Sequence, residues 1–338
     1  MKRVATACSR IVPKGTTRHN CLAVFLTLVA LGVLIITFDA EPAGAEPAGL
    51  LPMPVITSTQ PLPTNPPAGG VSSDKKGETQ TAAVTPQTTE QAIKSSRLAL
   101  EYHVALLEIG KHRLEKMSDY CANFTKQERV DGEELQDMQT IEVKLRHKPL
   151  SLYMKWNKGG DVGREVLYVD GHLDGEMLVH LGGIKGKLLP PLKLDPKGNR
   201  AMAEARHPVT EMGIQQLCTL LLTYRRRDLT LTNGIKWELV DNQKLGDREC
   251  YCFVVDYSDR TVEKTYRRAT TYIDKELMLP VCVRNFGWPA ESEKPIDPAT
   301  LDEQTLIEFY AYSDIKFDQR LGDEHFDKTN TEYRFIRR

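Results

Sequence analysis

The chain divides into three stretches that differ in the spacing of their apolar positions. Residues 21–38 form an unbroken uncharged run, residues 39–90 show no periodicity, and residues 91–338 change between helical and strand-like spacing. Only periodic spacing turns one face of a helix or strand toward a core. The pattern therefore predicts a leader over residues 1–38, a linker over residues 39–90, and one folded domain over residues 91–338.

Two segments of the folded part have helical spacing. Residues 91–117 predict a long helix buried on one broad stripe, formed by Ile93, Leu98, Tyr102, Ala105 and Ile109 and widened by Leu100, Leu107 and Leu114. A second helix, with Thr210 as its expected N-cap, carries apolar residues on one side: Ile214, Leu217, Cys218, Leu221 and Tyr224. It ends at Arg225–Arg227, whose positive charges interact favourably with the negative end of the helix dipole.

Most of the other periodic segments alternate every second residue, as strands do. Apolar and charged side chains alternate over residues 141–146, and the next run places apolar positions opposite Ser151, Tyr153 and Lys155. One dry and one wet face are typical of an antiparallel sheet. The run GKLLPPLKL, residues 186–194, is interrupted by two prolines and indicates an edge strand or a bulge.

The order of these segments predicts the fold class. One helix, about six strands, a second helix and about five strands give an α+β domain, in which a large antiparallel sheet carries its helices on one face.

The leader has the features of an export signal. Five cations and no acid precede the 18 uncharged residues from Cys21 to Phe38, which span roughly 27 Å as a helix. That length suits a signal anchor in the inner membrane, whereas Ala43-Gly44-Ala45 suits cleavage of a signal peptide. Either interpretation predicts a periplasmic or extracytoplasmic domain. The linker, with 9 of the 19 prolines, should be an extended tether.

Charge and motifs exclude several function classes. The 45 Lys and Arg residues nearly balance the 46 Asp and Glu residues, so we expect no nucleic-acid partner. The DGHLDG turn in GREVLYVDGHLDGEMLVHLGG, residues 163–183, starts like a calcium loop but has Leu181 at the position of the bidentate carboxylate. His103 and His112 would lie on opposite sides of a helix. We therefore predict no metal and no cofactor.

The folded part contains five cysteines, an odd number. Cys250 and Cys252 are expected side by side on a strand, where a cross-strand bond to Cys282 is one alternative and buried free thiols are the favoured one. No nucleophile elbow or phosphate loop is present, so an enzyme is not predicted. A less favoured hypothesis is an unrecognised enzyme that uses His180 or His207 with a nearby carboxylate.

The segment from Tyr120 to Leu222 resembles an exported bacterial family catalogued only as a domain of unknown function. The sequence segments that show this resemblance are YCANFTKQERVDGEE, LRHKPLSLYMKW, GREVLYVDG and LDPKGNRAMAEARHPVTEMGI. More distantly, the order of elements is similar to the periplasmic lipoprotein-carrier superfamily, LolA and LolB. That resemblance implies a sheet curved into an incomplete barrel, with the long N-terminal helix and the second helix packed on its concave face.

The carrier resemblance also implies a function and a set of lining residues. We expect a non-enzymatic binding protein that holds an acyl chain or a lipoprotein in an apolar cavity. The expected ligand-binding residues are Leu152, Met154, Trp156, Val166, Tyr168, Phe253 and Tyr257. The alternative is an envelope sensor or scaffold module that binds a partner protein, with membrane contact through the N-terminal apolar segment in both cases.

Overall fold

The computed structural model describes residues 56–58, 93–132, 134–290 and 296–336. The predicted leader, residues 1–38, and nearly all of the predicted linker lie outside the described residues.

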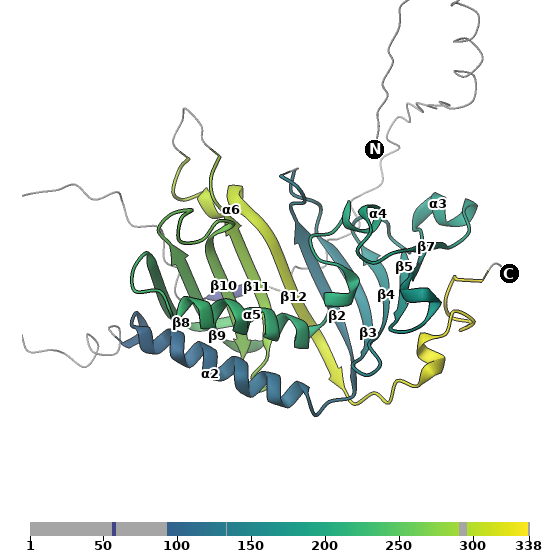
Figure 1. Ribbon diagram of the computed structural model, residues 1–338, viewed down its shortest axis with the longest axis horizontal. Helices are drawn as coiled ribbons and strands as arrows, with labels where there is room; N and C mark the ends of the chain where they lie inside the picture. Colours follow the sequence, from purple (N-terminus) through teal and green to yellow (C-terminus); the bar gives the residue numbers. More distant parts are fainter. Residues whose placement is uncertain (1–55, 59–92, 133, 291–295, 337–338) are drawn as a thin grey trace, which may run out of the picture. The chain divides into compact units, whose positions relative to one another are not determined.

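One antiparallel sheet contains all the described strands (Figure 1). Its order is β1-β8-β9-β10-β11-β12-β2-β3-β4-β5-β6-β7, so β1 and β7 are its edges and the barrel is incomplete. Before the second long helix lie β1 (Ile56–Ser58), β2 (Asp119–Glu128), β3 (Gln139–Arg146), β4 (Ser151–Lys158), β5 (Glu165–Val169), β6 (Met177–His180) and β7 (Leu192–Leu194). After it lie β8 (Ile235–Leu245), β9 (Arg248–Tyr257), β10 (Tyr266–Asp274), β11 (Pro280–Gly287) and β12 (Leu306–Phe317).

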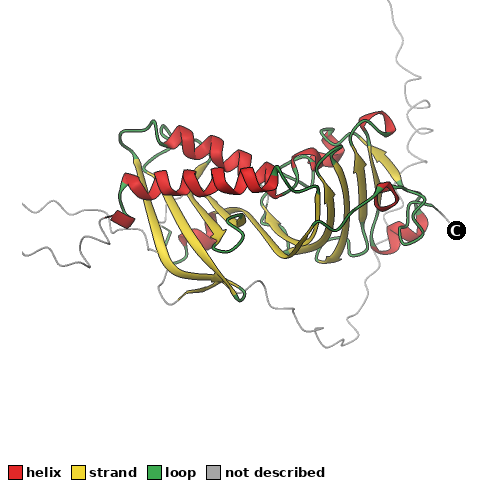
Figure 2. Ribbon diagram, turned by 90° about the horizontal axis from the view of Figure 1, so that it is seen from below, coloured by secondary structure: helices red, strands yellow, loops and turns green. Residues whose placement is uncertain are grey.

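Two long helices, α2 (Arg97–Leu114) and α5 (Ile214–Asp228), lie against one face of the sheet (Figure 2). They contact each other, α2 contacts β8 and β9, and α5 contacts β11. The shorter helices are α3 (Gly183–Leu188), α4 (Asn199–Met202), α6 (Leu301–Thr305) and the 3₁₀ turns η1 (Leu173–Gly175), η2 (Val209–Glu211) and η3 (Asp323–Phe326). The predicted α+β class, with six strands between α2 and α5 and five after α5, is confirmed.

The predicted buried stripe of α2 is correct for the widening residues Leu100, Leu107 and Leu114, but wrong for the residues that form it: Ile93, Leu98, Tyr102, Ala105 and Ile109. Leu98 and Ile109 are 53% and 46% exposed, whereas Leu100, Leu107 and Leu114 are buried. The helix has two apolar stripes, and packing against α5 and the sheet selects the one that contains Leu107. Gly110 permits this approach, because a Cβ there would lie 2.4 Å from the Met278 carbonyl oxygen.

The start of α5 also differs from the prediction. Gly213, not Thr210, is the N-cap residue, and Thr210 lies in η2. The Ile214 amide donates instead to the buried Tyr120 hydroxyl at 3.0 Å, so a side chain from β2 satisfies the helix terminus. The buried side of α5 is as predicted for Ile214, Cys218 and Leu221.

The expected wet face of the sheet is dry over β4–β6. Ser151 and Tyr153 are buried, because the C-terminal segment, residues 318–336, covers this face. The Tyr153 and Tyr333 rings stack with centroids 3.8 Å apart. The apolar face of β3 is buried as predicted, and its charged residues are only partly exposed.

The structure also decides the predictions for residues 186–194 and for the cysteines. The run at 186–194 begins as the end of α3 rather than as a strand, while β7 after the two prolines is an edge strand, as predicted. The five cysteines of the folded part are free, which confirms the favoured interpretation.

We expect Gly213→Ala to destabilise the protein by about 2 to 3 kcal/mol. Gly213 has φ +112°, and a Cβ there would lie 2.7 Å from Leu145 Cδ1. Chemical denaturation measures this loss. Gly132→Ala is the control, because its φ is +79° but no atom lies within 4 Å of the added Cβ; it should lose only about 1 kcal/mol. Equal losses would show that the close approach at Gly213 is unimportant.

His103 makes stability depend on pH. It is buried between the helices and the sheet and stacks on Phe253 with centroids 4.2 Å apart. Burial, and secondly the Arg225 charge, hold the pKa of His103 well below its usual range. Below about pH 6.5 the imidazole is protonated in the unfolded chain but stays neutral in the native protein. The free energy of unfolding therefore decreases as the pH is lowered.

We expect His103→Phe to retain the stack and remove this acid sensitivity. Relative to the variant, the wild type should lose roughly 2 kcal/mol of unfolding free energy between about pH 7 and pH 5. Denaturation at both pH values measures the difference. Parallel losses in the two proteins would contradict a neutral buried His103.

Candidate ligand-binding site

A cavity of about 620 Å³ lies between the helix-bearing face of the sheet and α5. Its sheet side comes from β2, β4–β7, β11 and β12, and residues 196–212, before α5, cover another side. The part over β4–β7 is mostly apolar, and its charged residues Asp161 and Arg164 pair with each other at 2.7 Å. Its apolar residues are Met154, Trp156, Val166, Met177, Val179, Leu181, Leu192 and Leu194. This volume is within the range of small-molecule sites.

The opposite end of the cavity is polar and lies at the pairing of β12 with β2. The register places Glu308 directly across from Glu128, and both residues are buried. Like charges directly opposite each other destabilise a sheet, and burial of a charge costs more when it lacks a partner. This end of the sheet therefore requires compensating groups.

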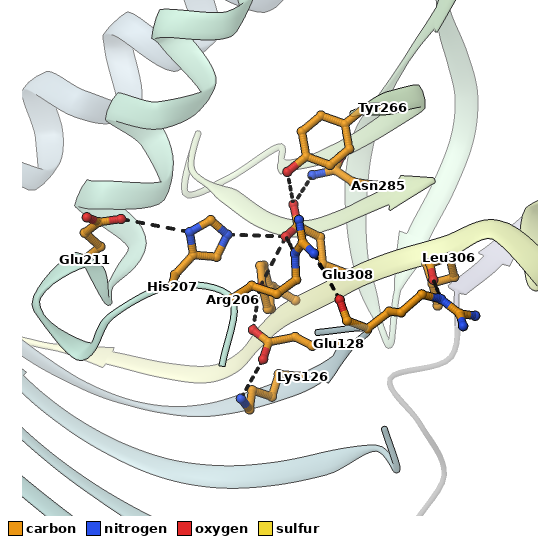
Figure 3. Close-up of polar contacts among 11 residues, drawn as sticks. Lys126, Glu128, Arg206, His207, Glu211, Tyr266, Asn285, Leu306 and Glu308 are labelled. Carbon is orange, nitrogen blue, oxygen red and sulfur yellow. Dashed lines mark hydrogen bonds and ion pairs between the residues drawn. The ribbon is translucent and has the colours of Figure 1, made fainter. Parts of the chain in front are cut away.

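Those groups surround the two carboxylates (Figure 3). Lys126 Nζ lies 2.9 Å from Glu128, and the Tyr310 hydroxyl donates to Glu128 at 2.5 Å. Glu308 accepts hydrogen bonds from four side chains: Arg206 Nε at 3.0 Å, His207 Nε2 at 3.3 Å, the Tyr266 hydroxyl at 2.9 Å and Asn285 Nδ2 at 2.6 Å. We call these residues, with the two carboxylates, the carboxylate cluster.

The carboxylate cluster shifts the titration of its members. Burial raises the pKa of Glu308, but hydrogen bonds from His207 and Asn285 and the charges of His207 and Arg206 outweigh burial and hold this pKa at about 2. The hydrogen bond to Glu308 raises the pKa of His207 above its usual value, although burial opposes the shift. Burial and the two carboxylates raise the pKa of Tyr310 well above its usual value.

The cluster also fixes residues 196–212 over the cavity. Arg206 and His207 belong to this segment, and Arg206 Nη1 donates to the Arg129 carbonyl at 2.9 Å. Farther along, Arg164 Nη1 pairs with Glu204 at 2.7 Å. Ionic contacts thus hold a segment with little regular structure against the sheet, and it forms one wall of the cavity.

Three of the seven predicted ligand-binding residues line the cavity: Met154, Trp156 and Val166. Leu152 and Tyr168 share their face and pair with each other across β4 and β5, outside the lining. Phe253 and Tyr257 lie under the helices, where Phe253 stacks on His103 and the Tyr257 hydroxyl donates to Asp228 at 2.8 Å. The structure therefore brings Met154, Trp156 and Val166 together at the cavity. It places Phe253 and Tyr257 elsewhere, under the helices.

The sequence interpretation missed the polar end of the cavity. Lys126 and Glu128 alternate with Gln127 on β2, a pattern that normally indicates a solvated face. A usable signal was present, since Phe124, Lys126 and Glu128 share one strand face, as do Glu308, Tyr310 and Tyr312. Charged residues in line with aromatic ones indicate a buried polar group.

The histidines of the enzyme hypothesis differ in their surroundings. His207 meets a carboxylate, whereas His180 is buried at the end of β6, opposite Glu165 in the register. The lining hydroxyls of Thr219 and Thr223 donate to carbonyls one turn earlier in α5, which occupies them. Among the described residues, no group of three or more His, Cys, Asp or Glu side chains could hold a metal ion.

The comparison with protein families identifies the chain. A family model described as "Protein of unknown function (DUF1571)" matches residues 117–335. The chain belongs to this family. The match covers the region of the sequence resemblance and extends through all the strands after α5, where the sequence interpretation found little to compare. No curated protein matches the chain.

Several solved structures are distantly similar to this DUF1571 protein. A putative outer membrane lipoprotein-sorting protein domain from Vibrio parahaemolyticus is 11% identical, with 68% of this chain and 97% of that chain covered and a TM-score of 0.33. A LolA superfamily protein from Nitrosomonas europaea is 12% identical, with 66% and 96% covered and a TM-score of 0.27. The Mycobacterium tuberculosis lipoprotein LppX is 11% identical, with 69% and 100% covered and a TM-score of 0.38.

One of these structures belongs to the LolA superfamily, which the sequence distantly resembles. In the part of the chain that the structure describes, no helix combines the length and the apolar character needed to cross a membrane. The predicted apolar anchor lies outside that part.

We expect His207→Gln to destabilise the protein by roughly 1 kcal/mol at about pH 6, a modest value because His207 is partly exposed. The raised pKa of His207 means that its ion pair stabilises the fold fully below the pKa of the unfolded chain. This contribution is lost as pH rises through the native pKa. Denaturation across the pH range should show the difference from wild type shrinking at alkaline pH.

Glu211→Gln is the matched control for this experiment. Glu211 lies 3.9 Å from His207 Nδ1 and is exposed, so its removal should hardly change stability. A larger effect for Glu211→Gln than for His207→Gln would contradict Glu308 as the dominant partner of His207.

Proposed function

We propose that this protein is a non-enzymatic exported binding protein that holds an acyl chain in the cavity under α5. The observation that carries the proposal is the polarity of the cavity, which is apolar over β4–β7 and polar at the carboxylate cluster. The apolar part of this lining matches a hydrocarbon chain, whereas the groups at the polar end are engaged with one another. A free lipid and the acyl group of a lipoprotein both supply such a chain.

Two physical arguments support an apolar ligand. The cavity opens to solvent, and its volume of about 620 Å³ is in the range of pockets that bind small molecules. Burial of hydrocarbon in such a space yields about 0.8 kcal/mol per CH₂ group. An acyl chain therefore offers enough apolar surface to bind without an additional strong polar contact.

The chemistry of the lining supports binding rather than catalysis. His207 is held between Glu308 and Glu211, and its raised pKa favours the protonated form, which is a poor general base. The two lining threonine hydroxyls are engaged within α5. These constraints leave the groups of the cluster as structural partners of one another.

The export signal of the sequence supports an extracytoplasmic location, and a lipid or lipoprotein is then an available ligand. The alternative, a sensor or scaffold that binds an envelope protein, needs no cavity. Occupancy of the cavity therefore separates the two functions.

Quenching of Trp156 tests the proposal. Trp156 lines the cavity, and its Nε1 donates to Gln139 at 2.8 Å. The chain has three tryptophans, so the titration uses delipidated protein with Trp237→Phe and Trp288→Phe, in which Trp156 alone remains. Dibromostearic acid should quench its fluorescence, because bromine quenches at contact. Val179→Phe should weaken this binding about tenfold or more, because the added ring fills space that the hydrocarbon would occupy.

Leu178→Phe is the matched control on the same strand. Leu178 packs on the opposite face, under the C-terminal segment, so the added ring should cost about 1 to 3 kcal/mol of stability and leave probe binding unchanged. Absence of Trp156 quenching in the single-tryptophan protein, or equal loss of quenching in both variants, would refute the acyl-chain site.

A further inference from the structure

Helix α3 exposes large aliphatic side chains at one end of the sheet. Ile184 and Leu188 are 75% and 68% exposed, and Leu189 directly follows them with 46% exposure. Val162 is also exposed and lies beside the start of the helix, where its carbonyl accepts from the Gly183 amide at 3.1 Å. We call Val162, Ile184, Leu188 and Leu189 the α3 patch.

The backbone of α3 is held closely against its neighbours. A Cβ at Gly182 would lie 2.3 Å from the Asp161 carbonyl oxygen, and one at Gly186 would lie 1.9 Å from the Leu181 carbonyl oxygen. Glycine at both positions lets the helix approach residues 161–162 and 180–181 directly. The aliphatic side chains are therefore presented outward by a fixed backbone.

Lysines lie within and after the helix that carries the α3 patch, and the one acid beside the patch, Asp161, is paired with Arg164. Residues 181–194 read LGGIKGKLLPPLKL, with three lysines and no acid. Lys193 pairs with Glu176 at 3.7 Å, while Lys185 and Lys187 are exposed on the helix itself. A short stretch of exposed Ile and Leu with lysines complements an anionic bilayer, where each lysine near the surface contributes about tenfold or less to partitioning.

We propose that the α3 patch is a membrane-contact surface that docks the folded domain on anionic lipid headgroups. Ile184, Leu188 and Leu189 enter the boundary between headgroups and acyl chains, and Lys185 and Lys187 face the phosphates. This contact is distinct from the predicted N-terminal anchor, because it is made by the folded domain.

The composition of the patch favours a bilayer over a protein partner. Protein interfaces are enriched in Trp, Tyr and Arg at their energetic centres and depleted in Lys. The α3 patch has no aromatic residue and no arginine. Aliphatic residues beside lysines are instead typical of interfacial helices.

The position of the patch also favours a lipid surface. Lys185 and Leu189 are at once exposed and part of the cavity lining, as is the exposed Arg200 of α4. The docked face thus borders the cavity, so an acyl chain could pass between bilayer and cavity without crossing water. Docking itself does not depend on what the cavity holds.

Photocrosslinking in vesicles tests the proposal with the full-length chain. A benzophenone amino acid replaces Ile184, or as a matched control Ile109, an exposed apolar residue of α2. Both variants carry residues 1–38, so any attachment through the leader is identical, and Ile109 is nearer to it in sequence. Vesicles of phosphatidylglycerol and phosphatidylethanolamine provide the anionic surface.

The expected result is about tenfold more lipid adduct at position 184 than at position 109. Lys185→Glu with Lys187→Glu, or vesicles of phosphatidylcholine alone, should reduce the adduct at 184 by about tenfold. Val179→Phe should leave it unchanged, which separates this proposal from the cavity. Equal adducts at 184 and 109, or adducts at 184 to a second copy of the chain instead of lipid, would overturn it.

Discussion

The pairing of β12 with β2 joins two parts of the described sheet, β1 with β8–β12 on one side and β2–β7 on the other. Its register sets Glu308 opposite Glu128 in a buried position. Two buried carboxylates face to face are tolerable only with cations and donors around them. Lys126, Arg206 and His207 supply the charges, so the pairing of distant strands dictates where the segment before α5 must lie.

That constraint also shapes the cavity. Arg206 and His207 draw residues 196–212 over the sheet, and their contacts with Glu308 occupy the polar end. On the other half of the sheet, α2 and α5 cover Phe253 and Tyr257 directly. The cavity lies over β2, β4–β7, β11 and β12, between this part of the sheet and α5.

Sequence periodicity predicts the elements well and their burial less well. The order of helices and strands and the buried side of α5 follow from spacing alone. The buried side of α2 follows only in part, because Leu98 and Leu107 lie on opposite sides of the helix and packing against α5 and the sheet buries the side of Leu107. Tyr153 is buried because a distant C-terminal segment covers it. Met154 and Phe253 are both apolar residues on the buried face of a strand. The placement of the helices, which the spacing does not give, decides which of the two lines a cavity.

We propose that the cavity holds an acyl chain in the native protein. The most direct measurement is the native mass of the protein isolated from its own envelope, compared with its mass after extraction with organic solvent. A loss of mass equal to a lipid or an acyl group is the predicted result, and it should be absent for Val179→Phe. An unchanged mass, with protein that also takes up no fatty acid after extraction, would contradict the account.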